Sequence, residues 1–371
     1  MLKLLRISYI PPKIVPFIQH QFVEKKPTTF KEAYRLFFDN FIAISDAITF
    51  ELNKLEDFEA IEVVINHTQL QEFWLKENSQ KTNLNALEIL HEQVNFYQPD
   101  VILVNTGLIQ ETEIRAMAPR GCFIMAWDGF VKPLLQQNKK YDLILTCLDS
   151  IQHKFEKIGT KSALLPFAFD PRVLNFVDST KTETCTFSGS ISAVHQSRLN
   201  FLHKLTKSGL DFNLYLGNYD TGLNPFSRTI LREIIQNKNS RNLLKIFQLQ
   251  ANNNKGGWGL EMYKILARSV STLNFHGDEV EKACNIRLFE ATGFGTCLVT
   301  DNKPGLEDFY KKDEEVLTFD HIDDLIDKLK YLENNPQIAH QIGEAGKAKV
   351  FSSHLWEHRV QDLVSIIHKH I

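Results

Sequence analysis

The chain has 371 residues, of which 43% are hydrophobic and 23% are charged, and its formal net charge is −3. This length exceeds the size at which a single hydrophobic core keeps growing, so we expect two domains. The small negative charge excludes the general positive field that draws proteins to nucleic acid.

The cysteines and the apolar runs bear on the cellular compartment. The five cysteines are an odd number without a CxxC pair, which predicts free thiols, a reducing compartment and no zinc site. The apolar run at the N-terminus is too short and too quickly interrupted to be a secretory signal peptide. No run in the sequence approaches the roughly 18 apolar residues that span a bilayer. We expect a cytoplasmic protein, with peripheral attachment at the inner face of a membrane as an open alternative.

Short apolar runs alternate with amphipathic helical patterns, which is typical of parallel sheets built from βαβ units. In the first half, helices are expected at about 29–54, with Thr28 or Thr29 as its cap, and at 84–96. The predicted strands of this half are 4–10, 60–66, 101–105, 122–127 and 143–147.

The second half repeats this alternation after a polar, irregular stretch at 171–183, which we interpret as a linker. Its predicted strands are 185–190, 212–217, 271–275, 296–300 and 316–319. Its predicted helices are 197–208, 259–268, 285–293, 321–334, 337–351 and 353–370. The sequence therefore predicts an α/β protein with two Rossmann-like domains facing each other, at 1–170 and 184–352, followed by a C-terminal segment at 353–371.

The segment from Asn285 to Gly295 is the most informative for function. It begins a helix after a polar loop and ends in glycines before an apolar strand. Ligands of open α/β sheets bind beyond the carboxyl ends of the strands, and the free amides at a helix start suit a phosphate. Arg287 can add a contact to a phosphate, and Glu290, one turn on, can accept from both hydroxyls of a ribose. The alternative is structural, with a surface ion pair between Arg287 and Glu290 and glycines that end the helix.

Several motifs of this half follow one another in a recognisable order. They are Phe187-Ser-Gly-Ser190, Gly259-Leu-Glu-Met-Tyr-Lys-Ile-Leu-Ala267, Leu273-Asn-Phe-His-Gly277, Asn285-x-Arg-x-Phe-Glu-Ala-Thr-Gly293 and Leu298-Val-Thr-Asp301. This half resembles the C-terminal domain of bacterial GT-B glycosyltransferases, in particular the spore-maturation-protein (CgeB)-like transferases. The resemblance extends over about 160–370 and, more thinly, over 1–160. It implies a GT-B fold with an acceptor-side first domain, a nucleotide-sugar-binding second domain and a C-terminal helix that crosses back to the first.

The resemblance also implies roles for individual residues. Glu290 would hold the donor ribose, and Asn285 and Arg287 would face the pyrophosphate. The glycine turn that opens the nucleotide-binding domain would be formed by Gly189 and Ser190. Arg198 would be available to a phosphate.

His276 follows the predicted strand 271–275 and, by the resemblance, would point into the cleft near the donor. The alternative for a lone histidine at a strand end is a structural side chain. Many retaining transferases of family-4 type have a second glutamate eight positions before the ribose-binding one, where this chain has Lys282, and the neighbouring Glu281 would face differently. The resemblance therefore does not predict whether the reaction retains or inverts the anomeric configuration.

The acceptor side is expected at the strand ends of the first half. Asp128, directly after strand 122–127, is placed to act as the general base of an inverting transfer, and its alternative role is that of a turn former before Gly129. Thr106 and Gly107 lie at the same expected edge, and His20 is a further candidate.

No His, Cys or carboxylate cluster has the spacing of metal ligands, and no Asp-x-Asp triplet occurs, so no bound metal is expected. The sequence predicts a metal-independent glycosyltransferase that moves a sugar from a nucleotide-sugar to a glycan, lipid-linked saccharide or protein, in bacterial surface polysaccharide or glycoconjugate synthesis. An epimerase or phosphorylase on the same fold and a non-catalytic nucleotide-sugar-binding protein remain alternatives.

No nucleic-acid partner is expected. A dehydrogenase is disfavoured because no GxGxxG follows a strand. One locally basic stretch is interpreted first as a solvated helix face, with contact to a membrane or an acidic partner as the alternative. Its residues are Arg228, Arg232, Lys238, Arg241 and Lys245.

Overall fold

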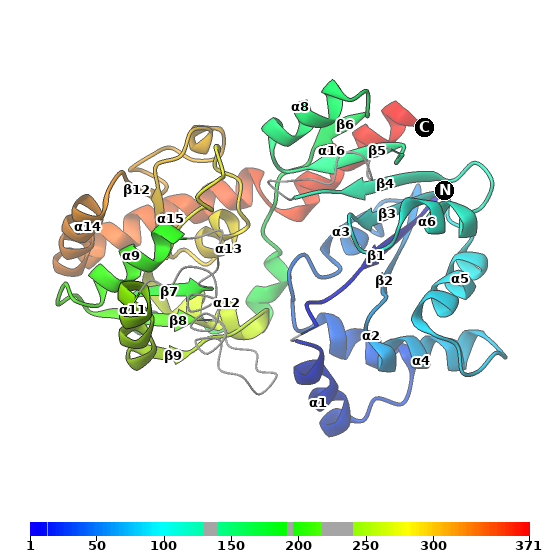
Figure 1. Ribbon diagram of the computed structural model, residues 1–371, viewed down its shortest axis with the longest axis horizontal. Coiled ribbons are helices and arrows are strands. Elements are labelled where there is room, and N and C mark those ends of the chain that lie inside the picture. The colour runs from blue at the N-terminus through cyan, green and yellow to red at the C-terminus, as the bar shows by residue number, and fades with distance from the viewer. Residues whose placement is uncertain (13, 130–139, 191–195, 217–239) are drawn as a thin grey trace. The chain divides into compact units, whose positions relative to one another are not determined.

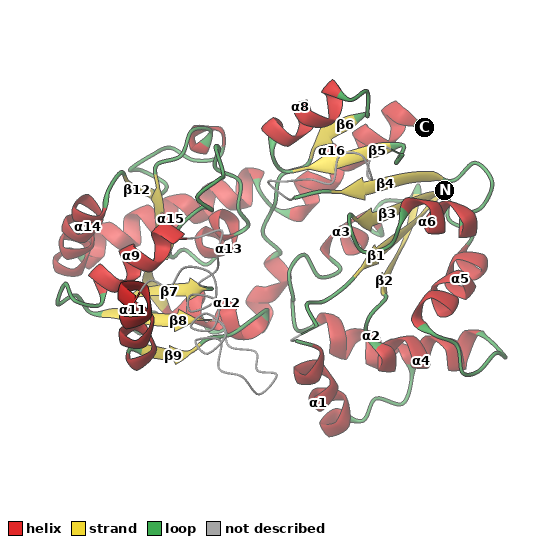
Figure 2. Ribbon diagram, in the orientation of Figure 1, coloured by secondary structure: helices red, strands yellow, loops and turns green. Residues whose placement is uncertain are grey.

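The computed structural model describes residues 1–12, 14–129, 140–190, 196–216 and 240–371 (Figure 1). The chain divides into two compact units, Met1–Pro166 with Trp356–Ile371, and Phe167–Leu355. Each unit is built on a parallel six-stranded sheet with helices packed against it (Figure 2). The prediction of two Rossmann-like α/β units is confirmed.

The sheet of the first unit has the strand order β2-β1-β3-β4-β5-β6. Its strands are β1 (Leu2–Ser8), β2 (Phe58–Val64), β3 (Val101–Asn105), β4 (Phe123–Trp127), β5 (Leu143–Thr146) and β6 (Ser162–Leu164). Its helices are α1 (Val15–Lys25), α2 (Phe30–Phe38), α3 (Ala47–Leu52), α4 (Thr68–Asn78), α5 (Ala86–Tyr97), α6 (Glu111–Met117), α8 (Asp149–Lys157) and α16 (Trp356–His370). The strands β3, β4 and β5 are apolar along most of their length, as is typical of a parallel sheet that helices cover on both faces.

The long helix expected over 29–54 is wrong, because the segment forms two helices, α2 and α3, with an irregular turn between them. Thr29 caps α2 by accepting the backbone N–H of Glu32. The helix stops because three residues of the turn have left-handed backbone conformations, with φ of 48°, 54° and 52°. They are Phe41, Ala43 and Ser45.

A buried ion pair holds this turn against the sheet. Arg6 on β1 donates from Nη1 to both carboxylate oxygens of its cross-strand neighbour Glu62, at 3.0 and 2.9 Å, and to the carbonyl of Ser45 at 2.6 Å. Burial raises the pKa of Glu62 to about 7, although the Arg6 charge opposes that rise.

The C-terminal helix α16 belongs to the first unit, which confirms the prediction that the chain crosses back to it. It packs against α3, and the ring of His368 stacks on Phe58 at the start of β2 with 6.0 Å between centroids. No helix within the described ranges is long and apolar enough to cross a membrane.

The sheet of the second unit has the order β12-β11-β10-β7-β8-β9. Its strands are β7 (Glu183–Gly189), β8 (Phe212–Leu216), β9 (Asn253–Lys255), β10 (Ser269–Asn274), β11 (Cys297–Asp301) and β12 (Leu317–Phe319). Its helices are α9 (Gln196–Leu205), α11 (Ser240–Ala251), α12 (Leu260–Arg268), α13 (Arg287–Gly293), α14 (Ile322–Asn334) and α15 (Pro336–Ser353). The stretch 171–183, expected to be a linker, lies inside this unit, where Pro171–Asn175 is a short 3-10 helix.

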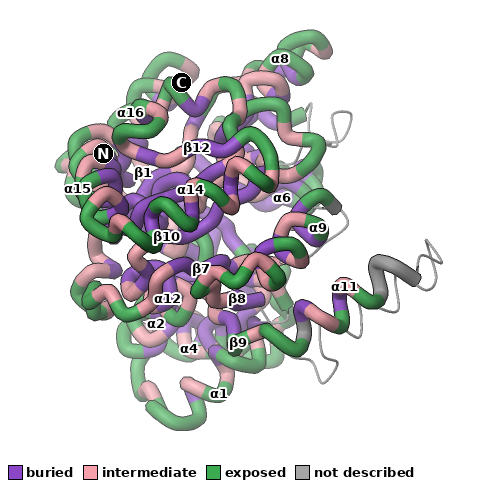
Figure 3. Tube along the Cα trace, turned by 90° about the vertical axis from the view of Figure 1, so that its left-hand side faces the viewer, coloured by how far each residue is buried: buried purple, intermediate pink, exposed green. Residues whose placement is uncertain are grey.

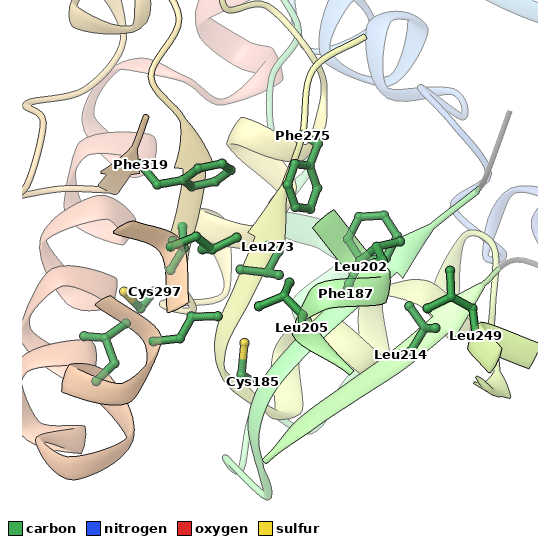
Figure 4. Close-up of a cluster of buried hydrophobic side chains, with 14 of the residues drawn as sticks. Cys185, Phe187, Leu202, Leu205, Leu214, Leu249, Leu273, Phe275, Cys297 and Phe319 are labelled. Carbon is green, nitrogen blue, oxygen red and sulfur yellow. The ribbon is translucent and has the colours of Figure 1, made fainter. Parts of the chain in front are cut away.

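The core of the second unit lies between its strands and the helices that cover them (Figure 4). Leu273 on β10 and Phe187 on β7 pack with Leu202 on α9, and Phe275 makes an edge contact with Phe319 at 5.5 Å. Buried residues follow the strands, whereas the helices alternate between buried and exposed positions (Figure 3).

Two glycines of α15 allow this helix to lie against backbone. A Cβ on Gly343 would come within 2.2 Å of the carbonyl oxygen of Gly295, and a Cβ on Gly346 within 2.5 Å of that of Glu315. Gly295 itself has a φ of 66°, in the turn that joins α13 to β11. This close approach sets the position of α13.

Replacement of Gly343 by alanine should lower the free energy of unfolding by about 1–3 kcal/mol, because the added methyl group overlaps a main-chain carbonyl. Urea unfolding of Gly343→Ala measures the change. The control is Ser352→Ala at an exposed site on the same helix, which should change stability by less than about 0.5 kcal/mol. A Gly343→Ala protein as stable as the wild type would show that α15 does not constrain α13.

Candidate functional site

The carboxyl ends of β10 and β11 are joined through a histidine and an aspartate. His276 follows β10, and its Nδ1 lies 2.7 Å from Oδ1 of Asp301, the last residue of β11. The backbone N–H of His276 donates to the same oxygen at 3.1 Å. The side chain of His276 is fully buried, and that of Asp301 is 22% exposed.

A row of polar side chains continues from Asp301 to Asn285, two residues before α13. Thr300 donates to Asp301 Oδ1 at 3.4 Å, Asn274 donates from Nδ2 to Thr300 Oγ1 at 2.9 Å, and Asn285 donates to Asn274 Oδ1 at 2.7 Å. We call these five residues, Asn285, Asn274, Thr300, Asp301 and His276, the strand-end network. The network links the start of α13 to the ends of two neighbouring strands.

Arg198 on α9 binds the ends of β7 and β10 through their carbonyls. It donates from Nη1 to the carbonyl of Ser190 and from Nη2 to that of Phe275, both at 2.7 Å, and its guanidinium lies 5.4 Å from the centre of the Phe187 ring. Burial lowers the pKa of Arg198 to about 10. Its charge is therefore held at this edge of the sheet, and of the three guanidinium nitrogens only Nε lacks a hydrogen bond.

Glu290 and Arg287 form a buried pair on the first turn of α13. Glu290 Oε2 lies 3.0 Å from Arg287 Nη1, and Oε1 accepts from the Tyr263 hydroxyl at 3.0 Å. Arg287 Nη2 also donates to the carbonyl of Ser188, one residue before Gly189, at 3.3 Å. Burial raises the pKa of Glu290, although Arg287 and Tyr263 both oppose the rise. The ion pair that the structural alternative expected does form, but it is buried at the strand ends and not on the surface.

Buried polar atoms without a hydrogen bond gather at this edge. Arg198 Nε, His276 Nε2 and Asn285 Oδ1 are such atoms, and the Arg287–Glu290 contact lacks hydrogen-bond geometry on both sides. Roughly nine in ten buried polar groups in native proteins are paired, so each exception needs an explanation. Here the explanation that fits is a polar ligand, or water in its place, at the carboxyl edge of the sheet.

At the first unit's sheet edge, Asp128 and Thr106 follow the neighbouring strands β4 and β3. Asp128 is fully buried and its backbone N–H donates to the carbonyl of Leu145 at 2.8 Å. Thr106 is buried, and its hydroxyl has no hydrogen-bond partner. Gly107 has a φ of 75°, as a turn after the strand requires. His20 lies elsewhere, with a largely exposed side chain on α1 that is 3.6 Å from Glu24.

Tyr263, Asn274 and Asp301 are polar partners that the sequence did not single out as site residues. The sequence predicted that they lie on a helix or at a strand end, but the side chains to which they form hydrogen bonds are distant in the sequence. Within the described residues, no group of three or more His, Cys, Asp or Glu side chains is close enough to hold a metal ion. Of the basic stretch, Arg228, Arg232 and Lys238 and the side chain of Arg241 lie outside the described part, while Lys245 on α11 donates to Asn200 at 2.6 Å.

Part of the chain is similar to a known protein family. Residues 198–365 match the family model described as glycosyl transferase-like. The matched stretch, which we call the glycosyl transferase-like domain after the model, contains Arg198, the strand-end network and the Arg287–Glu290 pair. A comparison with curated protein sequences gave no match.

Solved glycosyltransferases of GT-B type share the fold of the whole chain. HepE from Anabaena in complex with UDP-glucose matches with a TM-score of 0.62 at 9% identity, over 100% of both chains. A glycosyltransferase from Rickettsia africae matches with 0.61 at 11%, over 100% of this chain and 98% of that one. Sucrose-phosphate synthase from Thermosynechococcus elongatus matches with 0.60 at 10%, over 100% and 99%. The GT-B fold that the sequence predicted is confirmed.

Removal of the Tyr263 hydroxyl should destabilise the domain, because Glu290 Oε1 then stays buried without a donor. We expect Tyr263→Phe to lower the free energy of unfolding by about 1–3 kcal/mol. In a double-mutant cycle with Glu290→Gln, measured by urea unfolding, the two changes should couple by about 0.5–3 kcal/mol. Additive effects would show that the two side chains do not support each other.

Proposed function

We propose that the protein transfers a sugar from a nucleotide-sugar donor to a hydroxyl group of an acceptor. The observation that supports this most is the gathering of Arg198, His276, Asn285, Arg287 and Glu290 at one sheet edge, within the glycosyl transferase-like domain. Their unpaired atoms include donors for phosphate and acceptors for hydroxyl groups. A nucleotide-sugar presents both kinds of group.

In this proposal Glu290 accepts hydrogen bonds from the donor ribose. Its carboxylate is held by Tyr263 on one oxygen, and Arg287 lies at the other. Arg287 also donates a long hydrogen bond to the carbonyl of Ser188. A phosphate oxygen of the donor can replace this carbonyl as the acceptor. A guanidinium held in advance at this place stabilises the charge that develops on the leaving diphosphate. Gly189 and Ser190 continue this edge beyond β7, and Asn285 lies at the start of α13.

Asp128 is proposed as the general base that takes the proton of the acceptor hydroxyl. Its position suits this role, because Asp128 directly follows β4 at the carboxyl edge of the first unit's sheet, where open α/β sheets bind their ligands. We propose a glycan, a lipid-linked saccharide or a protein as the acceptor, in the synthesis of a bacterial surface polysaccharide or glycoconjugate. The site is proposed to work without a metal, on the cytoplasmic side, with membrane contact limited to the surface.

The experiment is a screen of UDP-, GDP-, ADP- and CMP-linked sugars by thermal shift, followed by nucleotide release with and without candidate acceptors. UDP-glucose is the first donor to try, because HepE was solved with it. We expect one nucleotide class to raise Tm and to be released faster when an acceptor is present. Binding without release would favour a binding protein, and conversion of the sugar without release an epimerase. Absence of any binding would contradict the proposal.

Replacement of Glu290 by glutamine should weaken nucleotide binding about 10- to 100-fold, because a charged acceptor for the ribose hydroxyls becomes neutral. Isothermal titration with the nucleotide selected in the screen measures the loss, and circular dichroism checks the fold. The matched control is Glu261→Gln, at an exposed residue of α12 whose carboxylate pairs with Lys264 at 2.8 Å. Unchanged affinity in Glu290→Gln would remove Glu290 from the site.

Replacement of Asp128 by asparagine should lower kcat by about 100-fold or more while donor affinity stays within twofold, because only the proton acceptor is lost. Steady-state transfer and donor titration separate the two quantities. Asp100→Asn, at the opposite edge of the same sheet, is the control and should transfer normally. Near-normal turnover of Asp128→Asn would exclude it as the base.

A further inference from the structure

His276 has one ring nitrogen paired and the other unpaired. Nδ1 lies 2.7 Å from Asp301 Oδ1, whereas the buried Nε2 makes no hydrogen bond. A flip of the imidazole ring would move Nδ1 away from Asp301, and the hydrogen bond between these two side chains would be lost. The orientation of the imidazole is thus set by Asp301.

Asp301 also decides which nitrogen carries the proton. Burial acts to raise the pKa of Asp301, but the side-chain hydrogen bond and the charge of His276, its backbone hydrogen bond and the Lys303 charge outweigh burial and leave that pKa below its usual range. The carboxylate is therefore ionised and accepts only. Nδ1 therefore donates to it, and in the neutral form of the ring the lone pair lies on Nε2, which is then an acceptor.

A buried acceptor calls for a donor. The phosphate oxygens of a nucleotide-sugar are themselves acceptors and would be repelled by the Nε2 lone pair, whereas sugar hydroxyl groups can donate. The strand-end network connects this ring to Asn285 at the start of α13. The unpaired nitrogen therefore belongs to the same edge as the residues proposed to bind the diphosphate, but its chemistry suits the sugar.

We infer that Asp301 is a positioning residue, which fixes His276 with its proton on Nδ1 so that Nε2 accepts a hydrogen bond from a hydroxyl of the donor's sugar. The inference rests on the proposed function and assigns the sugar half of the donor to this part of the site. His276 would then bind one hydroxyl group of the sugar and so contribute to the choice among donor sugars.

The tautomer can be tested without any ligand. In protein labelled with ¹⁵N-histidine, the ring signals of His276 are assigned by their loss in His276→Phe. We expect a protonated Nδ1 and an unprotonated Nε2 in the wild type, and loss of that preference in Asp301→Asn, whose neutral side chain keeps the shape but attracts the Nδ1 proton less. Asp320→Asn, an exposed aspartate beyond β12 that accepts from Asn302 at 2.9 Å, is the control and should leave the signals unchanged. A proton on Nε2 in the wild type would overturn the inference.

The ligand is tested by comparing UDP with UDP-glucose, or the corresponding pair of the nucleotide class that the screen selects. Asp301→Asn and His276→Phe should each bind the nucleotide-sugar about 3- to 10-fold more weakly and bind the diphosphate as the wild type does. An equal loss for the diphosphate would mean that the ring binds phosphate, and a loss of kcat alone would make it a base. Either result overturns the inference. If the wild type binds no nucleotide at all, the proposed function fails, and the NMR result still decides the tautomer.

Discussion

The second unit depends on how polar groups are paired where its parallel strands end. Parallel strands finish with free carbonyl groups, and a buried carbonyl without a donor costs about as much as a lost hydrogen bond. Arg198 donates to two such carbonyls and Arg287 to a third. The groups that satisfy these carbonyls are thus cations, and the same hydrogen bonds hold them at this edge before any ligand binds.

The pairing at this edge is incomplete. Glu290 is buried with a raised pKa, and its contact with Arg287 lacks hydrogen-bond geometry. A fold under selection for stability alone would fill such positions with apolar side chains of similar size. Residues that break this rule at the edge where α/β proteins bind ligands are expected at a functional site. The incompletely paired groups are therefore the proposed binding place of the donor's hydroxyl and phosphate groups.

The sequence predicted the strands well because apolar runs bounded by polar turns determine them: 101–105 and 212–217 were expected, and Val101–Asn105 and Phe212–Leu216 are found. It missed β9, whose residues Asn-Asn-Lys have no apolar character. It also merged α2 and α3, because the turn between them contains neither glycine nor proline.

The sequence was sufficient to choose site residues, because ligands of α/β proteins bind where strands end. It was not sufficient to predict the hydrogen-bond partners of these residues. Tyr263 is 27 positions from Glu290, and Asp301 is 25 from His276, so only the folded sheet reveals the pairs.

A crystal structure of the protein with a bound nucleoside diphosphate would show directly whether this edge binds the donor. We expect the ribose hydroxyls within hydrogen-bond distance of Glu290 and the phosphates between Arg287 and the start of α13. Electron density for the nucleotide at any other edge of the molecule, with the Arg287–Glu290 contact unchanged, would contradict it.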